Sequence, residues 1–451
     1  MAGIYSAHDL AKLKVDTEGG SDTGIISETV LNHGSVIKDS LSMVIFIGVT
    51  NLFNYLYQLT MGILLPQALY SVFFSLTSLL VVIMVFSQTL TVAIAKHVSR
   101  LQAREQAKSV NFFWKTSLKN SLLWGMVIFV ISIALSPLVT NLLKLNNIIY
   151  PVIVFSSLPF LFLLSVNWGV LQGMQRFFHF GFSQAITAAL KVVIAALMVY
   201  LGYGIYGGLT AIPVSFALAL LISFAPLRNL PATEQQESPK VHLYAYSLLT
   251  LLAMLAITML ANIDVILARN FFPPDDASNY SAISVLGRVA FYAPIGITAA
   301  MFPKASILYE SSGRHERLFL KAMVLVLCIT GAVVLIYGLF PNTINNFIFG
   351  SKYPVVSVYL FSYGLTMALF GFSFFLMSYL LSLNQTRVAF LLCGIAFVQL
   401  ILLSLFHTNI ALMINIMLSC GTICVISLTL YIITTALRRK INGYRQDERS
   451  H

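Results

Sequence analysis

Charged residues are scarce in this sequence, since Asp, Glu, Lys and Arg make up only 10% of its 451 residues. Soluble proteins use about 25%, and so small a share would not keep a chain of this length in solution. Hydrophobic residues reach 58%, the mean hydropathy is +0.86, and long apolar runs recur from Leu41 to Leu437. The composition excludes a soluble globular protein and predicts a polytopic membrane protein.

Motifs for metal, redox or nucleotide chemistry are also missing. The four cysteines lie in apolar runs, and Cys420 and Cys424 share a helix face without a His or acidic neighbour. We therefore expect packing roles for them and no metal site. No G-x-x-x-x-G-K-[ST] loop occurs, which excludes ATP binding by a P-loop. We expect no cofactor, no catalytic residue and no enzymatic activity, so uphill transport would draw on an ion gradient or the membrane potential.

Apolar runs of roughly 20 residues, the length that crosses a bilayer, occur twelve times. An even number of crossings places both termini on the same side of the membrane. The predicted spans are 40–64, 68–94, 119–139, 149–172, 180–202, 206–226, 244–270, 279–302, 320–340, 355–382, 388–406 and 409–435.

Basic residues gather on the side of the membrane that both termini share. The opposite side carries only Lys144, Arg269 and Lys352. Cytoplasmic loops are enriched in Lys and Arg, so we expect a multi-pass protein of the plasma (inner) membrane with both termini in the cytoplasm. The net charge of +11 then reflects topology, and nucleic acid is not an expected partner. Residues 1–37 lack the pattern of a signal peptide and are expected to form a cytoplasmic tail.

The two halves of the chain share an order of short motifs. "TVAIAKHVSRL" (91–101) corresponds to "TAAMFPKASIL" (298–308), and their lysines, Lys96 and Lys304, lie 208 residues apart. "LQGMQRF" (171–177) corresponds to "LSLNQTRVAF" (381–390), with arginines 211 residues apart. Near-constant offsets predict two repeats with the same orientation.

This repeat predicts an all-α polytopic membrane protein with two six-helix lobes around a central cavity. The predicted organisation is a cytoplasmic tail at 1–37, an N-lobe at 38–226, a cytoplasmic linker at 227–243, a C-lobe at 244–437 and a basic cytoplasmic tail at 438–451.

Three ionisable residues lie well inside predicted spans: Lys191, Asp264 and Arg288. A charge at the bilayer centre costs about 2.5–3.5 kcal/mol, so each should face protein or water. Two interpretations stay open: Asp264 and Arg288 form an ion pair between adjacent helices, or the charges line a cavity. Two cations outnumber one anion, which favours an anionic ligand such as phosphate, and the planar fork of arginine suits phosphate well.

Polar residues accompany these charges at helical spacing and predict stripes that line the cavity. The predicted lining residues are Asn51, Asn54 and Gln58 in the first span, Gln184 and Thr187 in the fifth, and Ser281, Ser284 and Tyr292 in the eighth.

Two further residues carry expectations about structure. Arg269 lies near the predicted membrane boundary beside Asp275 and Asp276, and we expect it to be an interfacial anchor. Pro294 lies six residues beyond Arg288 and predicts a bend in the eighth span.

Two stretches resemble a known family. "LQGMQRF" followed by "ALKVVIAALMVYLGYGIYGGL" (189–209), and above all "NIDVILARNFFPPDDASNYSAISVLGRVAFYAPIGITAAMFPKAS" (262–306), are similar to bacterial O-antigen and capsule flippases. These flippases belong to the multidrug/oligosaccharidyl-lipid/polysaccharide (MOP) exporter superfamily. The resemblance covers about 40–440 in topology.

The resemblance implies two lobes that alternate between inward-open and outward-open states, with a polyprenyl-pyrophosphate-linked glycan as cargo. It also implies membrane lipids and glycan polymerase or assembly machinery as partners. Lys191, Asp264 and Arg288 occupy positions where the family often carries charges. The first span offers Asn51, Asn54 and Gln58 where some lipid II flippases place a cavity arginine, which argues against peptidoglycan precursors.

Three other functions compete with this flippase. A multidrug or metabolite antiporter of the same superfamily would export cations, which surplus positive charge disfavours. A membrane glycosyltransferase or polymerase would need acidic residues or a large loop on the outer face, where the predicted loops are short. A non-transporting scaffold would not explain why the chain carries charges inside its spans at an energetic cost.

Overall fold

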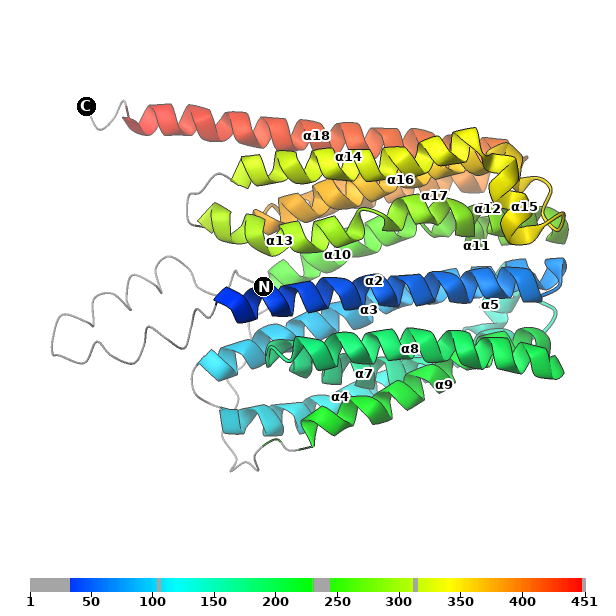
Figure 1. Cartoon of the computed structure of the whole chain (residues 1–451), viewed down its shortest axis with the longest axis horizontal. Coiled ribbons are helices and arrows are strands. Elements are labelled where there is room, and N and C mark those ends of the chain that lie inside the picture. The colour runs from blue at the N-terminus through cyan, green and yellow to red at the C-terminus, as the bar shows by residue number, and fades with distance from the viewer. Residues whose placement is uncertain (1–32, 104–106, 229, 231–243, 311–314, 448–451) are drawn as a thin grey trace.

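The computed structural model of the protein describes residues 33–103, 107–228, 230, 244–310 and 315–447 (Figure 1). Most of the predicted N-terminal tail (1–37) and of the predicted linker (227–243) lies outside the described residues. In the predicted C-terminal tail (438–451), the described backbone continues as a helix to Asp447.

The described residues form helices throughout and contain no strand. In the first half these are α2 (His33–Leu64), α3 (Gln67–Ala103), α4 (Ala107–Ala134), α5 (Ser136–Leu142), α6 (Ile149–Phe155), α7 (Leu158–Gly173), α8 (Phe177–Met198) and α9 (Gly204–Phe224). In the second half they are α10 (Tyr244–Leu260), α11 (Ile263–Phe271), α12 (Pro274–Tyr292), α13 (Ile295–Glu310), α14 (His315–Leu339), α15 (Pro341–Phe349), α16 (Val356–Ser382), α17 (Val388–Leu405) and α18 (Ile410–Asp447).

Within the described ranges, nine segments are long and apolar enough to cross a membrane, or ten with the bent pair α10–α11 counted as one. One of the nine, Phe177–Leu227, holds two crossings, because α8 and α9 pack against each other. The chain reverses between them at Gly202 (φ 91°) and Gly204 (φ 51°), a backbone region that glycine adopts without strain. With α2 at the position of the first predicted span, the helices match the twelve predicted crossings.

Several spans are broken where the sequence carries proline. The eighth span divides into α12 and α13 at Ala293 and Pro294, the position at which the sequence predicts a bend. Pro137 and Pro341 lie in the first turns of the short helices α5 and α15, where their missing N–H costs nothing. Pro213 lies inside α9 without ending it.

The structure repeats its irregular features in the two halves. Left-handed residues follow the short helices α5 and α15, at Lys144 (φ 47°) and Gly350 (φ 62°). They also follow α7 and α16, at Gln175 (φ 59°) and Asn384 (φ 58°). The offsets, 206 and 209 residues, agree with those of the sequence motifs. The predicted internal repeat is therefore a property of the backbone as well.

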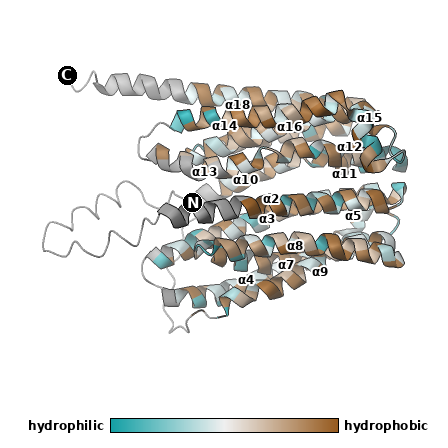
Figure 2. Cartoon of the chain, viewed as in Figure 1, coloured by the Kyte–Doolittle hydropathy of each residue, from teal (hydrophilic) through white to brown (hydrophobic). Residues whose placement is uncertain are grey.

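Two lobes of helices lie side by side, α2–α9 in one and α10–α18 in the other (Figure 1). The N-lobe packs α2 on α8 and α3 on α7, and the C-lobe packs α12 and α18 on α16. Between the lobes, α3 packs against α10, α11 and α12. Hydrophobic residues run along the lengths of the helices, and hydrophilic ones gather at ends such as the start of α14 (Figure 2).

The first turns of α2 and the end of α18 lie at the same end of the molecule (Figure 1), which we call the terminal face. The opposite end, where α2 and α5 end and α15 lies, is called the distal face.

Candidate functional site

The two charges of the C-lobe meet in its interior. Asp264 lies in the first turn of α11 and is 0% exposed, and Arg288 on α12 is 3% exposed. Arg288 Nη2 lies 3.6 Å from Asp264 Oδ1. Asp264 Oδ2 accepts hydrogen bonds from the hydroxyls of Tyr280 (3.0 Å) and Tyr363 (2.7 Å). Of the two interpretations left open by the sequence, the structure shows the ion pair.

Arg288 also reaches across the boundary between the lobes. Its Nη1 donates to Ser78 Oγ at 3.3 Å, and its guanidinium carbon lies 4.9 Å from the centre of the Phe74 ring, a cation–π arrangement. Both residues belong to α3 of the N-lobe. Nε and Nη2 of Arg288 make no hydrogen bond within the described part of the chain. The guanidinium is thus held by one long ion pair and one hydrogen bond, and α3 covers it.

Phosphate binding by Arg288 in a cavity stays a prediction, and the contacts seen here describe one conformation. In the conformation seen here the guanidinium is covered by Phe74 and Ser78 and paired with Asp264. Its helix begins at Pro274, five residues earlier than the predicted start at 279. Arg288 therefore lies about 21 Å along the helix from the distal face, at a rise of about 1.5 Å per residue, which is deeper than the sequence suggested.

The tyrosines that hold Asp264 depend on close packing of α12 against α16. A Cβ atom at Gly287 would lie 2.3 Å from Cδ1 of the buried Tyr363 ring. We expect Gly287→Ala to displace this ring and to cost about 1–3 kcal/mol of stability, as overpacked cores do. Thermal unfolding of the purified protein measures this. Gly296→Ala is the control, because its Cβ would meet nothing within 4 Å; equal losses in the two variants would contradict the expectation.

Lys191 lies in the other lobe, between α8 and α2. Its Nζ donates to Asn54 Oδ1 at 2.6 Å and lies 4.8 Å from the centre of the Tyr57 ring. The Tyr57 hydroxyl in turn donates to the Gly208 carbonyl at 2.8 Å. Lys191 and Asn54 are half-buried. Lys191 therefore has neutral partners, and it differs from Arg288 in being partly accessible.

The other predicted lining residues divide into two groups. Ser281 and Thr187 are buried, and their hydroxyls donate within their own helices, to Ala277 O (2.8 Å) and Ser183 O (2.5 Å). Ser284 is also buried, and its hydroxyl has no hydrogen-bond partner among the described residues. Asn51, Gln58, Gln184 and Tyr292 are half-buried. A role in lining a cavity stays a prediction for all of them.

A set of inter-lobe contacts at the distal face was not predicted from the sequence. Lys352, between α15 and α16, donates through Nζ to the carbonyls of Gly62 (2.8 Å), Ile63 (2.9 Å) and Leu65. The neighbouring Tyr353 hydroxyl donates to the Gly62 carbonyl at 3.1 Å. A cation of the C-lobe thus caps the last turn of α2 in the N-lobe, where the helix dipole is negative.

Arg269 makes a second contact of the same kind and corrects the expectation of an interfacial anchor. It is 6% exposed. Its Nε donates to Leu143 O and its Nη2 to Lys144 O, both at 3.1 Å, at the end of α5. Nη1 donates to Ser71 Oγ on α3 at 3.2 Å. We call Arg269, Lys352 and Tyr353, with the N-lobe carbonyls that they bind, the distal latch.

One feature of the sequence indicates the distal latch, namely basic residues on the side of the membrane that has few of them. Arg269 and Lys352 are two of the three basic residues on a side of the membrane otherwise poor in them, and both have N-lobe carbonyl acceptors in the structure. No carboxylate takes part in these contacts.

No metal site accompanies these features in the part of the chain that the structure describes, because no three His, Cys, Asp or Glu side chains cluster there. All four cysteines are free; Cys420 and Cys424 are buried in α18, and Cys328 is exposed on α14.

The fold matches solved transporter structures, whereas the sequence matches no family model and no curated protein. A multidrug resistance MATE family transporter of the MOP superfamily, in an inward-facing conformation, has a TM-score of 0.72 and 15% identity over 89% of this chain and 98% of its own. An outward-facing MATE transporter has a TM-score of 0.64 at 15% identity over 90% and 96%.

A MOP superfamily transporter from Pyrococcus furiosus, described as having a binding pocket of reverse polarity, has a TM-score of 0.64 at 16% identity over 89% and 96% of the two chains. The chain is thus a multi-pass membrane protein with the fold of the MATE transporters of the MOP superfamily.

Proposed function

We propose that the protein is a flippase that moves a polyprenyl-pyrophosphate-linked oligosaccharide, an O-antigen, capsule or exopolysaccharide repeat unit, from the inner to the outer leaflet of the plasma membrane. The terminal face would then be cytoplasmic and the distal face external. The observation that carries this proposal is a surplus of positive charge between the helices. Asp264 is matched by Arg288, whereas the partners of Lys191 among the described residues are the neutral Asn54 and Tyr57.

A half-buried cation without a carboxylate partner favours an anionic cargo, because the phosphate oxygens of the cargo would supply the neutralising negative charge. Asn51, Asn54, Gln58, Gln184, Thr187, Ser281, Ser284 and Tyr292 would offer hydrogen bonds to sugar hydroxyls along the path. A glycan polymerase or related assembly enzyme would take over the cargo after transfer.

Alternating access would expose the charges in turn. The distal latch holds the lobes together at the distal face, and the higher TM-score with the inward-facing transporter supports an arrangement closed on that side. In this arrangement α3 covers Arg288, while Lys191 is partly accessible. We infer that the pyrophosphate meets Lys191 first and Arg288 only when the lobes separate and α3 moves away from the guanidinium.

A multidrug cation antiporter is the second candidate, favoured by the fold shared with MATE transporters. An antiporter of cations would need acidic residues that are free to bind them. Among the described residues, Asp264 is already held by Arg288, Tyr280 and Tyr363. For the Pyrococcus furiosus neighbour, the reverse polarity of its binding pocket is described as suggesting a different function.

Substitution of Lys191 tests the proposal. We expect Lys191→Gln to lower glycan export about tenfold or more and to leave lipid-linked intermediate on the inner leaflet, since a charge-assisted hydrogen bond is worth about 1.5–3 kcal/mol. Lys191→Arg keeps the charge and should retain more export. Surface glycan and lipid-linked intermediate are measured at matched protein levels.

The control is Lys115→Gln, which removes an exposed lysine from α4. Wild-type export by Lys191→Gln would contradict the flippase proposal. Resistance to cationic dyes that depends on the protein, without any change in glycan export, would favour the antiporter.

A further inference from the structure

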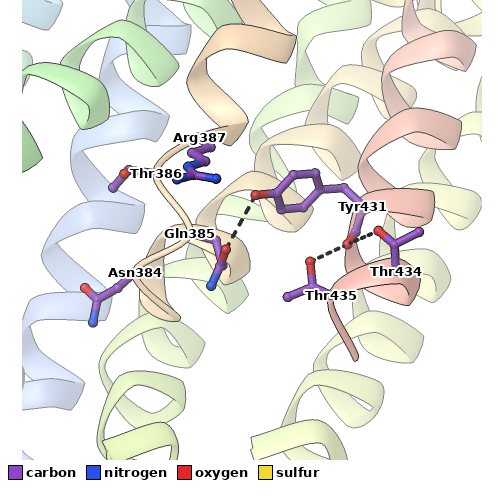
Figure 3. Close-up of a pocket in the computed structure, with 7 residues that line it drawn as sticks. All are labelled: Asn384, Gln385, Thr386, Arg387, Tyr431, Thr434 and Thr435. Carbon is purple, nitrogen blue, oxygen red and sulfur yellow. Dashed lines mark hydrogen bonds between the residues drawn. The ribbon is translucent and has the colours of Figure 1, made fainter. Parts of the chain in front are cut away.

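A pocket of about 440 Å³ opens at the terminal face of the C-lobe, away from the charges already described (Figure 3). The loop between α16 and α17 forms one wall, and α18 forms the other. Seven residues line the pocket: Asn384, Gln385, Thr386, Arg387, Tyr431, Thr434 and Thr435. None of them is acidic, and Arg387 is the single charged residue among them.

The pocket lies at the depth where the membrane-spanning segments end. The span of α16 ends at Ser382 and that of α17 begins at Val388, and Thr435 lies two residues before Leu437, the last residue of the apolar run of α18. These boundaries mark the level at which a bilayer passes from hydrocarbon to headgroups. A pocket between them therefore opens toward lipid phosphates.

Two hydrogen-bond donors of the pocket, the Gln385 amide and the Arg387 guanidinium, are available to a ligand. Thr434 and Thr435 donate to the Tyr431 carbonyl (3.1 and 2.7 Å), and the Tyr431 hydroxyl lies 3.5 Å from Gln385 Oε1. These contacts use the acceptor of Gln385 and leave its amide N–H groups unbound. The exposed Arg387 guanidinium makes no ion pair or hydrogen bond with the residues that the structure describes. In Figure 3 Arg387 and Gln385 lie on the loop opposite Tyr431.

The internal repeat supplies a comparison. Arg176 directly follows the left-handed Gln175, whereas Arg387 lies three residues after the left-handed Asn384. Arg176 Nη1 donates to the carbonyl of Pro226, which lies in the short 3-10 helix Ala225–Leu227 directly after the end of α9 at Phe224. On the C-lobe side α18 continues to Asp447, so its carbonyls there are bonded within the helix. Among the described residues, Arg387 thus lacks a carbonyl partner of the kind that Arg176 has.

We propose that this pocket binds the phosphate of an anionic phospholipid headgroup, with the Arg387 guanidinium and the Gln385 amide as donors. Arginine pairs with phosphate through two parallel N–H donors, and basic sites between helices at this depth suit anionic headgroups.

Lipid-dependent thermal stability of the full-length protein tests this site. Purified protein in neutral detergent is titrated with phosphatidylglycerol, with phosphatidylcholine and with inorganic phosphate. We expect phosphatidylglycerol to raise the unfolding temperature of the wild type most, and Arg387→Gln to weaken its apparent affinity about tenfold, with Arg387→Lys between the two. Stabilisation by inorganic phosphate that also requires Arg387 would identify the free ion as a source of the bound phosphate.

Arg228→Gln is the matched control, because it removes an exposed arginine from the N-lobe end of the terminal face. An unchanged response to phosphatidylglycerol in Arg387→Gln would overturn the proposal. An equal loss in Arg228→Gln would overturn it as well, because the effect would then reflect net charge alone.

Discussion

Asp264→Asn is expected to destabilise the protein by about 3–5 kcal/mol, because it leaves the buried Arg288 guanidinium without its counter-charge. Arg288→Met is expected to cost less. A carboxyl group can take up a proton when its partner is lost, whereas a guanidinium keeps its charge. Asp264 would also retain the hydroxyl donors of Tyr280 and Tyr363. Thermal unfolding of the purified variants measures the difference.

The double variant Asp264→Asn/Arg288→Met sharpens this prediction. It removes both charges, so we expect it to be more stable than Asp264→Asn alone, a non-additive effect that reports the pair itself. If Arg288→Met were the more damaging of the two single changes, or if the two losses simply added, then Arg288 would be stabilised mainly by α3 and not by Asp264.

Disrupting the distal latch is expected to separate the lobes at the distal face. Lys352→Met removes a charged donor from three backbone carbonyls, and a hydrogen bond to a charged group is worth about 1.5–3 kcal/mol. A net loss of about 2 kcal/mol shifts the equilibrium between closed and open states about 30-fold. Arg269→Met should act in the same direction, and the double variant should favour the open state most.

Spin labels at Leu64 and Ser351, exposed positions on the two sides of the distal latch, report this change in a variant whose native cysteines are replaced. The distance distribution should lengthen in Lys352→Met. Lys144→Met is the control, because Arg269 binds the carbonyl and not the side chain of Lys144. A distribution that stays short in the double variant would show that apolar packing, and not these cations, holds the lobes together.

These two predictions are linked through α3. Ser71 of this helix binds Arg269 of the distal latch, and Ser78, two turns further along, binds Arg288. Movement of α3 away from the C-lobe would break both contacts. We therefore expect latch variants to raise the accessibility of Arg288, which ties opening of the distal face to exposure of the buried cation.

Local patterns in the sequence were enough to predict the number of crossings, the repeat and the helix break at Pro294. Each depends on local properties: the length of an apolar run, the spacing of a motif, and the missing N–H of proline. It also singled out Lys191, Asp264 and Arg288, because charge inside an apolar run is costly wherever the helix lies.

The partners of these charges depend on how the helices pack, which local sequence patterns do not specify. Arg288 pairs with Asp264 beneath α3 in this conformation, and its cover by α3 depends on how the two lobes come together. Arg269 and Lys352 bind backbone carbonyls, and every residue carries one, so no sequence pattern marks those acceptors. Arg176 and Arg387 stand in similar motifs but differ in their partners, because one neighbouring helix ends beside its arginine and the other continues.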